Sequence, residues 1–129
     1  MKFVALVILM SLSACLKDET ISGQSDASEV WALVRMNETE ISTPITLTFP
    51  EKGKIAGRAP CNRYFASQNA PLPWFEAGPI AATKVACPEL ALESLYFQTL
   101  ASITLIERTG DVLLLNGDQG EVLEFRLET

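Results

Sequence analysis

Alternating apolar and polar residues predict β-strands through much of this chain. At residues 45–49, Ile45, Leu47 and Phe49 alternate with two threonines. Successive side chains of a strand point to opposite faces, so this pattern indicates a strand with one buried face. Apolar runs bounded by turn residues predict further strands at residues 29–36, 54–58, 62–67, 74–76, 80–83, 104–108, 112–115 and 122–127.

One segment has helical spacing instead. A single helix face would carry Leu92, Leu95, Tyr96, Thr99, Leu100 and Ile103. Pro88 suits the first helical turn, and Glu89 and Glu93 suit its positive end. This face is expected to pack on strands that carry Trp31, Phe49, Trp74 and Phe125. The chain is therefore predicted to be an α+β domain, with a mostly antiparallel curled sheet or partial barrel covered by one main helix at about residues 88–102.

Residues 1–14 have the layout of a secretory signal peptide. Lys2 gives a positive start, residues 3–10 are apolar, and small residues follow before Cys15. As a helix, residues 3–14 would span only about 18 Å, whereas the hydrocarbon core of a bilayer is about 30 Å thick. The apolar run is therefore too short to cross a membrane.

Leu-Ser-Ala-Cys at residues 12–15 resembles a bacterial lipobox, in which the signal peptide is cut before the cysteine and that cysteine is acylated. The alternative is an ordinary secretory signal, which would leave Cys15 as a free thiol. In enteric bacteria, an Asp directly after the lipidated cysteine retains a lipoprotein in the inner membrane. This chain has Leu16 there, which favours an outer-membrane location facing the periplasm. Residues 15–28 are then the lipidated cysteine and a flexible tether, because they are polar, and residues 29–129 are the folded domain.

Composition and charge exclude several function classes. The chain is 48% hydrophobic and 20% charged, which fits one globular domain. With 16 acidic and 10 basic residues, its formal net charge of −6 argues against a nucleic-acid partner. The absence of histidine removes Ser-His-Asp and Cys-His catalysis and most zinc sites. We therefore expect no cofactor and no metal site.

Cys61 and Cys87 remain as a pair once Cys15 is acylated. In an exported, oxidising compartment such a pair predicts a disulfide, which would close about 26 residues and stabilise the fold by about 3.5 kcal/mol. Two buried free thiols are the alternative, because cysteine packs well in an apolar interior. A zinc site is disfavoured, since two cysteines without histidine fall short of tetrahedral ligation.

Four short motifs resemble those of a known family. W-x-L begins at Trp31, G-x-x-x-C-N-x-[FY]-[FY] at Gly57, T-x-x-x-C at Thr83 and E-x-x-[FY]-[FL]-x-x-L at Glu93. In this order and spacing they are similar to the META (HslJ-type, heat-shock-associated) domain of bacterial lipoproteins, over nearly all of the chain after residue 30. The motif residues, expected to be mainly structural, are Trp31, Gly57, Asn62, Thr83, Glu93, Phe97 and Leu100.

Each polar motif residue has a structural interpretation. Asn62 is expected to bond nearby backbone in a turn rather than a ligand, and Thr83 to form a similar local cap. Glu93 is expected to be an exposed or capped helical glutamate rather than a buried functional carboxylate. The apolar residues of this helix motif are expected in the core: Tyr96, Phe97 and Leu100.

The residues around Cys61 depart from the family pattern. Ala59 and Pro60 stand where the family often has small residues, commonly glycine, so the loop entering Cys61 is expected to differ in shape. Arg58 and Arg63 flank this loop. They are expected to be solvated strand ends, with an anion site as the alternative.

The resemblance implies a non-enzymatic protein of the cell envelope, linked in general terms to envelope stress, antibiotic tolerance or secretion. Its partners would be the membrane, through the lipid on Cys15, and an unidentified envelope protein or apolar ligand. One alternative is a carrier of an acyl chain or peptide, like the pilot lipoproteins whose fold is similar, and this needs an apolar pocket of about 300 Å³ or more. Another is an inhibitor of a basic host enzyme such as lysozyme, attracted by the negative charge. An enzyme would have to rely on carboxylate pairs such as Glu89 and Glu93, which match no recognised catalytic arrangement.

Overall fold

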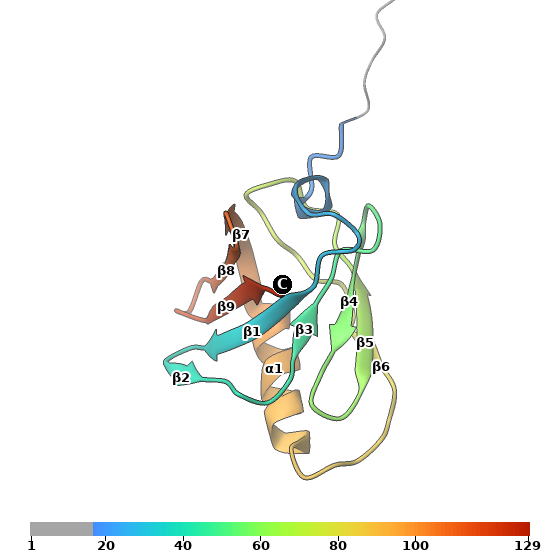
Figure 1. Ribbon diagram of the computed structural model, residues 1–129, viewed down its shortest axis with the longest axis vertical. Helices are drawn as coiled ribbons and strands as arrows, with labels where there is room; N and C mark the ends of the chain where they lie inside the picture. The colour runs from blue at the N-terminus through green and yellow to red at the C-terminus, as the bar shows by residue number, and fades with distance from the viewer. Residues whose placement is uncertain (1–16) are drawn as a thin grey trace, which may run out of the picture.

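Two antiparallel sheets and one long helix form the domain (Figure 1). The structure is a computed structural model that describes residues 17–129. The large sheet, with the order β2-β1-β9-β8-β7 and β3 also paired to β1, contains β1 (Trp31–Met36), β2 (Thr39–Glu40), β3 (Thr46–Leu47), β7 (Ile103–Thr109), β8 (Val112–Gly117) and β9 (Val122–Leu127). The small sheet, with the order β4-β5-β6, contains β4 (Lys54–Arg58), β5 (Arg63–Ser67) and β6 (Ala81–Ala82). Helix α1 (Leu90–Ser102) leads directly into β7.

Strand β3 links the two sheets and lets one curl toward the other. It pairs with β1 through Leu47 and Trp31. Just beyond it, the Thr48 N–H donates to the Ala56 carbonyl of β4 at 2.7 Å, and the Ala56 N–H donates back at 3.1 Å. The two sheets remain separate and do not close into a barrel. The predicted α+β class with a mostly antiparallel, curled sheet is confirmed.

The alternation seen in the sequence places the core on the inner faces of the strands. Trp31 and Leu33 of β1 are buried, as are Leu123 and Phe125 of β9, while Glu124 between them faces outward. Ile45, Leu47 and Phe49 are also buried, as predicted. These side chains pack with Tyr96 and Leu100 of α1 in one apolar cluster.

The buried face of α1 differs from the predicted one. The helix begins at Leu90, two residues after the expected start, and its buried residues are Glu93, Tyr96, Thr99 and Leu100. Leu95, expected on the buried face, is 46% exposed, and Leu92 is only partly buried. The face is rotated because the Glu93 carboxylate takes a place in the interior, where backbone and amide N–H groups bind it.

The predicted tether over residues 15–28 is too long, because its second half packs on the domain. Ile21 begins a 3-10 helix, Ile21–Gln24, and is 1% exposed within the core. The Leu72 N–H donates to the Glu19 carbonyl at 2.8 Å, and the Trp31 indole N–H donates to Ser25 Oγ at 3.1 Å. A single buried isoleucine anchors a segment that is otherwise polar, which composition alone could not reveal.

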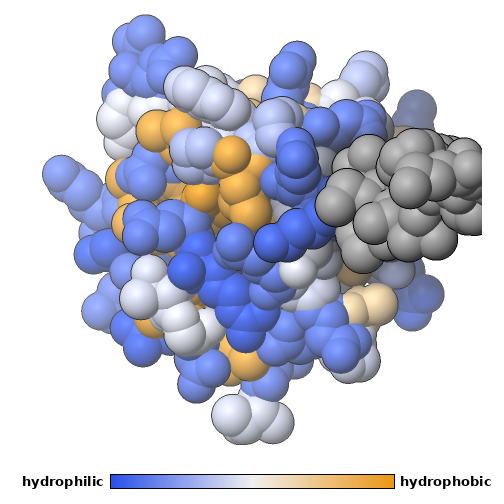
Figure 2. Space-filling model, turned by 90° about the horizontal axis from the view of Figure 1, so that it is seen from above, coloured by the Kyte–Doolittle hydropathy of each residue, from blue (hydrophilic) through white to orange (hydrophobic). Residues whose placement is uncertain are grey.

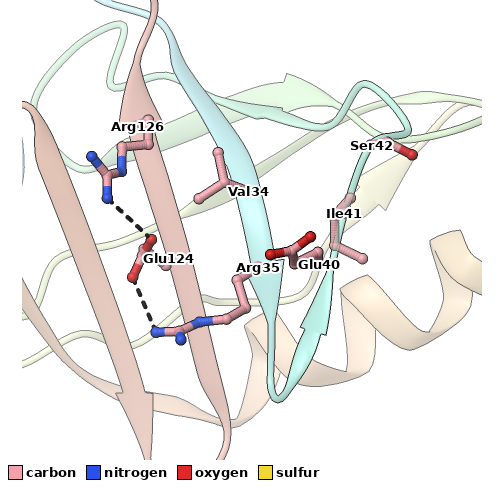
Figure 3. A pocket seen from close by; sticks show the side chains of 7 residues that line it. All are labelled: Val34, Arg35, Glu40, Ile41, Ser42, Glu124 and Arg126. Carbon is pink, nitrogen blue, oxygen red and sulfur yellow. Dashed lines mark hydrogen bonds and ion pairs between the residues drawn. The ribbon is translucent and has the colours of Figure 1, made fainter.

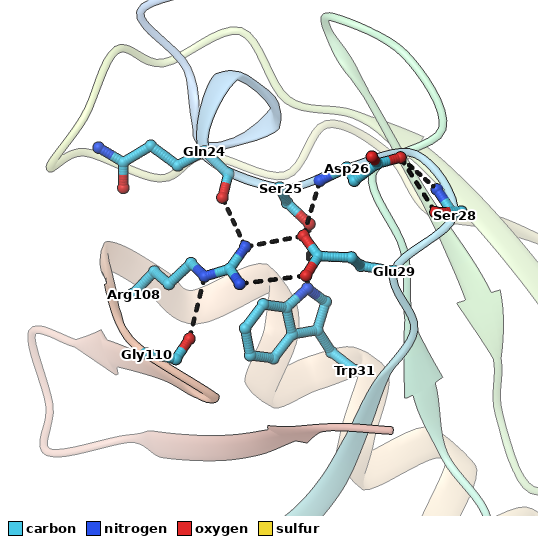
Figure 4. A network of polar contacts seen from close by, with 8 residues as sticks. All are labelled: Gln24, Ser25, Asp26, Ser28, Glu29, Trp31, Arg108 and Gly110. Atoms are coloured by element: carbon cyan, nitrogen blue, oxygen red, sulfur yellow. Dashed lines mark hydrogen bonds and ion pairs between the residues drawn. The ribbon is translucent and has the colours of Figure 1, made fainter. Parts of the chain in front are cut away.

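A polar network fastens this segment to β7 (Figure 4). The Arg108 guanidinium donates to both carboxylate oxygens of Glu29, at 2.8 and 3.1 Å, and to the Gln24 carbonyl at 2.6 Å. Its central carbon lies 4.8 Å from the centroid of the Trp31 ring, a cation–π contact. These hydrogen bonds from Arg108 lower the pKa of Glu29 to about 2. The network joins residues 24–31 to the β7–β8 hairpin.

Some shorter predicted elements are reduced or displaced. Trp74, expected over the core, is 57% exposed, because residues 73–75 pair with the outer edge of β7 and place Trp74 opposite Leu105. The strand predicted at residues 80–83 is present only as the two residues of β6. Among residues 17–129, no helix has both the length and the apolar character needed to span a membrane. Cys15 and the predicted signal peptide lie outside the described residues.

Candidate functional site

The Glu93 carboxylate is the centre of a buried polar cluster formed by three of the motifs. Glu93 lies in the first turn of α1 and is 4% exposed. One carboxylate oxygen accepts the backbone N–H groups of Cys61 at 3.0 Å and Asn62 at 2.8 Å. The other accepts the Asn62 side-chain amide at 2.7 Å. Three N–H donors thus replace the water that the carboxylate loses on burial.

Asn62 connects this carboxylate to the loop that precedes α1. Its side-chain oxygen accepts the Thr83 hydroxyl at 2.8 Å and the Val85 N–H at 2.6 Å. Its amide group also donates to the Val85 carbonyl at 3.0 Å. Thr83 Oγ1 accepts the backbone N–H of Arg63 at 3.3 Å. One side chain therefore binds the start of β5, the loop at residues 83–85 and the helix.

The disulfide between Cys61 and Cys87 closes the same region, with Cα atoms 5.5 Å apart. It confirms the predicted pair and joins the loop before β5 to the loop before α1. The expected roles of Asn62, Thr83 and Glu93 are wrong. Asn62 and Glu93 are buried, and the partners of all three residues lie 20 or more positions away in the sequence. Local turn geometry could not reveal bonds that span 31 residues, such as those from Asn62 to Glu93.

Gly57 and two tyrosines form a second buried contact between the sheets and the helix. The Tyr64 hydroxyl donates to the Thr46 carbonyl at 2.7 Å and accepts the Tyr96 hydroxyl at 2.6 Å. A Cβ on Gly57 would lie 2.0 Å from the Thr46 oxygen and 2.8 Å from the Tyr64 hydroxyl. Glycine is therefore required for this close approach. Burial raises the pKa of both tyrosines, which stay protonated at physiological pH.

The apolar motif residues belong to the core, as predicted. Trp31 and Leu100 are fully buried, and Phe97 is partly buried against that core. The Phe97 ring also lies edge-on to Tyr64, with centroids 5.4 Å apart. Within residues 17–129, every buried side-chain nitrogen or oxygen has a hydrogen-bond partner. The motif residues therefore maintain the scaffold and leave no unpaired buried group aimed at a substrate.

A surface groove on the large sheet is a candidate binding site (Figure 3). This groove of about 550 Å³ lies between β1, β2 and β9 and is lined by Val34, Arg35, Glu40, Ile41, Ser42, Glu124 and Arg126. Arg35 lies 3.0 Å from one Glu124 oxygen, and Arg126 lies 3.7 Å from the other. The two arginine side chains are 47% and 59% exposed. They leave N–H donors free for a ligand beside the apolar Val34 and Ile41.

Part of the lining of this groove could be predicted from the sequence. Alternation in the last strand predicts that Glu124 and Arg126 point away from the core, and they do. Alternation could not reveal that Glu40 and Ser42 line the groove, because the two-residue strand β2 has no hydrophobic pattern. A register shift between Leu33 and Arg35, at Val34, also turns the Arg35 side chain outward.

The two larger hollows among residues 17–129 are open grooves. A second groove, of about 510 Å³ beside Trp74 and Phe75, also contains Glu76 and Asp118. The view in Figure 2 shows a mainly hydrophilic face, with apolar residues in small separate areas. No group of three Cys, Asp or Glu side chains among residues 17–129 is arranged to hold a metal ion. The structure therefore offers grooves for surface contacts.

Comparisons with known proteins agree with this fold. The META domain family model matches residues 24–129. A solved NMR structure of a protein from Burkholderia xenovorans is 24% identical, with a TM-score of 0.67 over 84% of this chain and 87% of that one. A DUF4847 family protein from Bacteroides vulgatus, solved by crystallography, is 15% identical, with a TM-score of 0.61 over 78% and 92% of the two chains. No curated protein matches.

Proposed function

Because this chain belongs to the META domain family, we propose that it is a non-enzymatic binding module of the cell envelope, held at a membrane by a lipid on Cys15. It binds envelope components through its surface and supports tolerance of envelope stress. The apolar run that ends in Leu-Ser-Ala-Cys at residues 12–15 supports the lipid anchor, and Leu16 supports an outer-membrane location facing the periplasm.

The proposal that the protein is not an enzyme rests on the burial and the hydrogen bonds of the motif residues. Glu93, the one carboxylate in the motifs, is 4% exposed and accepts three N–H donors, and Asn62 uses both ends of its side-chain amide within the protein. A general acid or base must instead reach a substrate proton within about 3 Å. These residues therefore act by fixing the position of α1 against the small sheet.

The groove bounded by Arg35, Glu40 and Glu124 is the surface we assign to the partner. Its arginines hold the Glu124 carboxylate from two sides and still expose N–H groups. A peptide segment with an acidic side chain next to an apolar one fits this lining, because the acid can take a guanidinium and the apolar group can contact Ile41. The alternative of an internal acyl-chain carrier receives no support from the open grooves.

Site-specific photocrosslinking in living cells tests this proposal. A photoreactive residue at Ser42 lies in the groove, and one at Gln119 lies in the exposed β8–β9 turn as a control. The proposal predicts a discrete crosslinked species for Ser42 and none for Gln119. Equal crosslinking at both positions, or none at Ser42 under any growth condition, would contradict the assigned groove.

A further inference from the structure

Positive charge is concentrated in one part of this acidic chain. Residues 52–88 contain a single acidic residue, Glu76, although the whole chain has 16. The same stretch contains half of the 10 basic residues, namely Lys52, Lys54, Arg58, Arg63 and Lys84. It forms the small sheet and the loops around it. The net negative charge of the protein therefore conceals one basic side.

Strand register places three of these cations and an aromatic ring on the outer face of the small sheet. Ile55, Tyr64 and Ala66 are buried, so the alternate residues of β4 and β5 point outward. Phe65 pairs with Ala56 on one side and Ala81 on the other, and it is 63% exposed. We call this outer surface the basic face, defined by Lys54, Arg58, Arg63 and Phe65.

Arg58 and Arg63 lie directly opposite each other in the β4–β5 register. Their Cβ atoms are therefore only about 5 Å apart, an arrangement in which like charges repel. Within the described residues neither arginine forms an ion pair, whereas Arg35, Arg108 and Arg126 all do. Both are exposed. An anion bound between the two guanidinium groups would remove the repulsion and use their free donors.

The basic face begins at the end of the domain where the chain enters. Lys17 and Lys52 line one hollow together with Glu19, Asn69 and Pro71. Lys52 precedes β4, and Asn69 follows β5, so this hollow lies at one end of the basic face. Figure 1 shows the first described residues in blue at the same end as the loop before β4. Lys17 is only two residues beyond Cys15.

We propose that the basic face is a membrane-contact surface that binds the phosphate groups of anionic lipids. Arg58 and Arg63 take the phosphates and Phe65 enters the interfacial layer beside them, while Lys54 is already paired with Glu51 at 2.8 Å. Cations near an anionic bilayer and an aromatic ring at its headgroup level are favourable for this reason. The orientation relative to the anchor rests on the proposed lipid at Cys15, but the binding of the face to anionic lipid does not.

A lipid surface fits better than an acidic protein because the face is one side of a three-stranded sheet with a single exposed aromatic ring. A protein partner would be expected to fill a recess, and the residues of the basic face line none of the grooves described above. Two hollows border the face, one of about 360 Å³ at Ser67, Asn69 and Glu76 and one of about 230 Å³ at Thr83, Lys84 and Leu90.

Vesicle sedimentation with the full chain carrying Cys15→Ser tests this proposal without any acyl chain. Vesicles of phosphatidylcholine are compared with vesicles that also contain phosphatidylglycerol. Residues 1–14, which include the cation Lys2, are present in every sample, so the change in preference between variants reports the basic face. One cation near such a surface contributes about fivefold in binding, so Arg58→Gln with Arg63→Gln should reduce the preference about 25-fold.

The matched control is Thr109→Glu with Gln119→Glu, which makes the same change in net charge at exposed positions of the large sheet. It should alter the preference less than about threefold. An equal loss for both double variants, or no preference for anionic vesicles in the starting protein, would overturn the proposal.

Phe65→Trp gives a second readout that does not depend on net charge. Brominated lipid in anionic vesicles should quench the tryptophan fluorescence of the Phe65→Trp protein more strongly than that of the parent chain, which has two tryptophans. An introduced indole that stays unquenched in vesicle-bound protein would contradict insertion of the face. Intact-mass analysis of the lipid on Cys15 is a separate measurement, so failure of the anchor and failure of the basic face are distinguishable.

Discussion

Glu93 stabilises this protein by accepting three hydrogen bonds inside the fold, although nothing in its helical surroundings indicates that role. Its three N–H donors come from residues more than 30 positions earlier in the chain. Removing one partner of a buried, charge-assisted hydrogen bond costs much more than removing an exposed one. The free energy of unfolding should therefore be very sensitive to this side chain.

We expect Glu93→Gln to lower the free energy of unfolding by about 3 kcal/mol, because the new amide group would place its own hydrogens against the Asn62 amide. Urea titration followed by the fluorescence of buried Trp31 measures the change. Glu89→Gln, at an exposed position just before α1, is the control and should change stability by less than about 0.5 kcal/mol. Equal stability of the Glu93→Gln protein would contradict the network.

Gly57→Ala tests the close approach of β4 to β3. The added methyl group would meet the Thr46 oxygen at 2.0 Å, so strands or tyrosines must shift. We expect a loss of about 2–3 kcal/mol in the same urea titration, in the range of other overpacked sites. A shift in the near-ultraviolet signal of Tyr64 and Tyr96 should accompany it. An unchanged midpoint would show that the strands lie farther apart.

At the residue scale, hydrophobic spacing and motifs predict which residues are buried, but they do not predict which residues a buried side chain contacts. Trp31 and Leu100 were predicted correctly, because burial of an apolar side chain is visible in strand or helix spacing. Asn62 and Glu93 were not, because a buried polar residue depends on donors and acceptors that folding brings from elsewhere.

At the element scale, the strands with clear alternation agree closely with the structure. The strands β4 and β9 have their predicted bounds, whereas β2 and the 3-10 helix were missed. Those two elements have only two and four residues, too few for a hydrophobic period to identify them. The tether prediction failed because Ile21 packs in the core and the Gln24 carbonyl accepts Arg108, a residue far along the chain.

The contact between Glu29 and Arg108 should make the docking of residues 20–29 depend on pH. The pKa of Glu29 is lowered to about 2 in the folded protein, from 4.5. A lowered carboxylate pKa stabilises the fold above the unfolded value, and this stability is lost as the pH falls from about 5 toward 2.

We therefore expect Arg108→Gln to be less stable than the parent protein at pH 6, with the difference shrinking as the pH approaches 2. Urea titrations of both proteins across this range provide the measurement. Faster amide exchange at Gly23, whose N–H donates to the Thr20 carbonyl, should accompany the substitution at pH 6. A difference that stays constant with pH would show that the ion pair does not hold the segment.

At the scale of the whole molecule, one disulfide bond joins the loop before β5 to the loop before α1. The disulfide joins Cys61 to Cys87 over a separation of 26 residues. The chain-entropy relation then gives about 3.5 kcal/mol of stabilisation. Cys61→Ala with Cys87→Ala should show a loss of about this size, and reductant should destabilise only the parent protein. Equal stability with and without reductant would contradict a formed disulfide.

The curled sheet and its single helix could be predicted from the sequence, because antiparallel strands and one helical period leave few arrangements. The placement of the charged side chains on the two sheets could not be predicted in the same way. It depends on strand register, which places Arg58 opposite Arg63 and gathers Arg35, Glu124 and Arg126 in one groove.

The state of Cys15 is the most direct measurement of the proposed function. Protein extracted from the membranes of the native bacterium should have an intact mass that corresponds to residues 15–129, with acyl chains on the N-terminal cysteine and an oxidised pair at Cys61 and Cys87. Cys15→Ser should remove the lipid and release the protein from the membrane fraction. An unmodified, water-soluble chain beginning at Cys15 or later would contradict a membrane-anchored module.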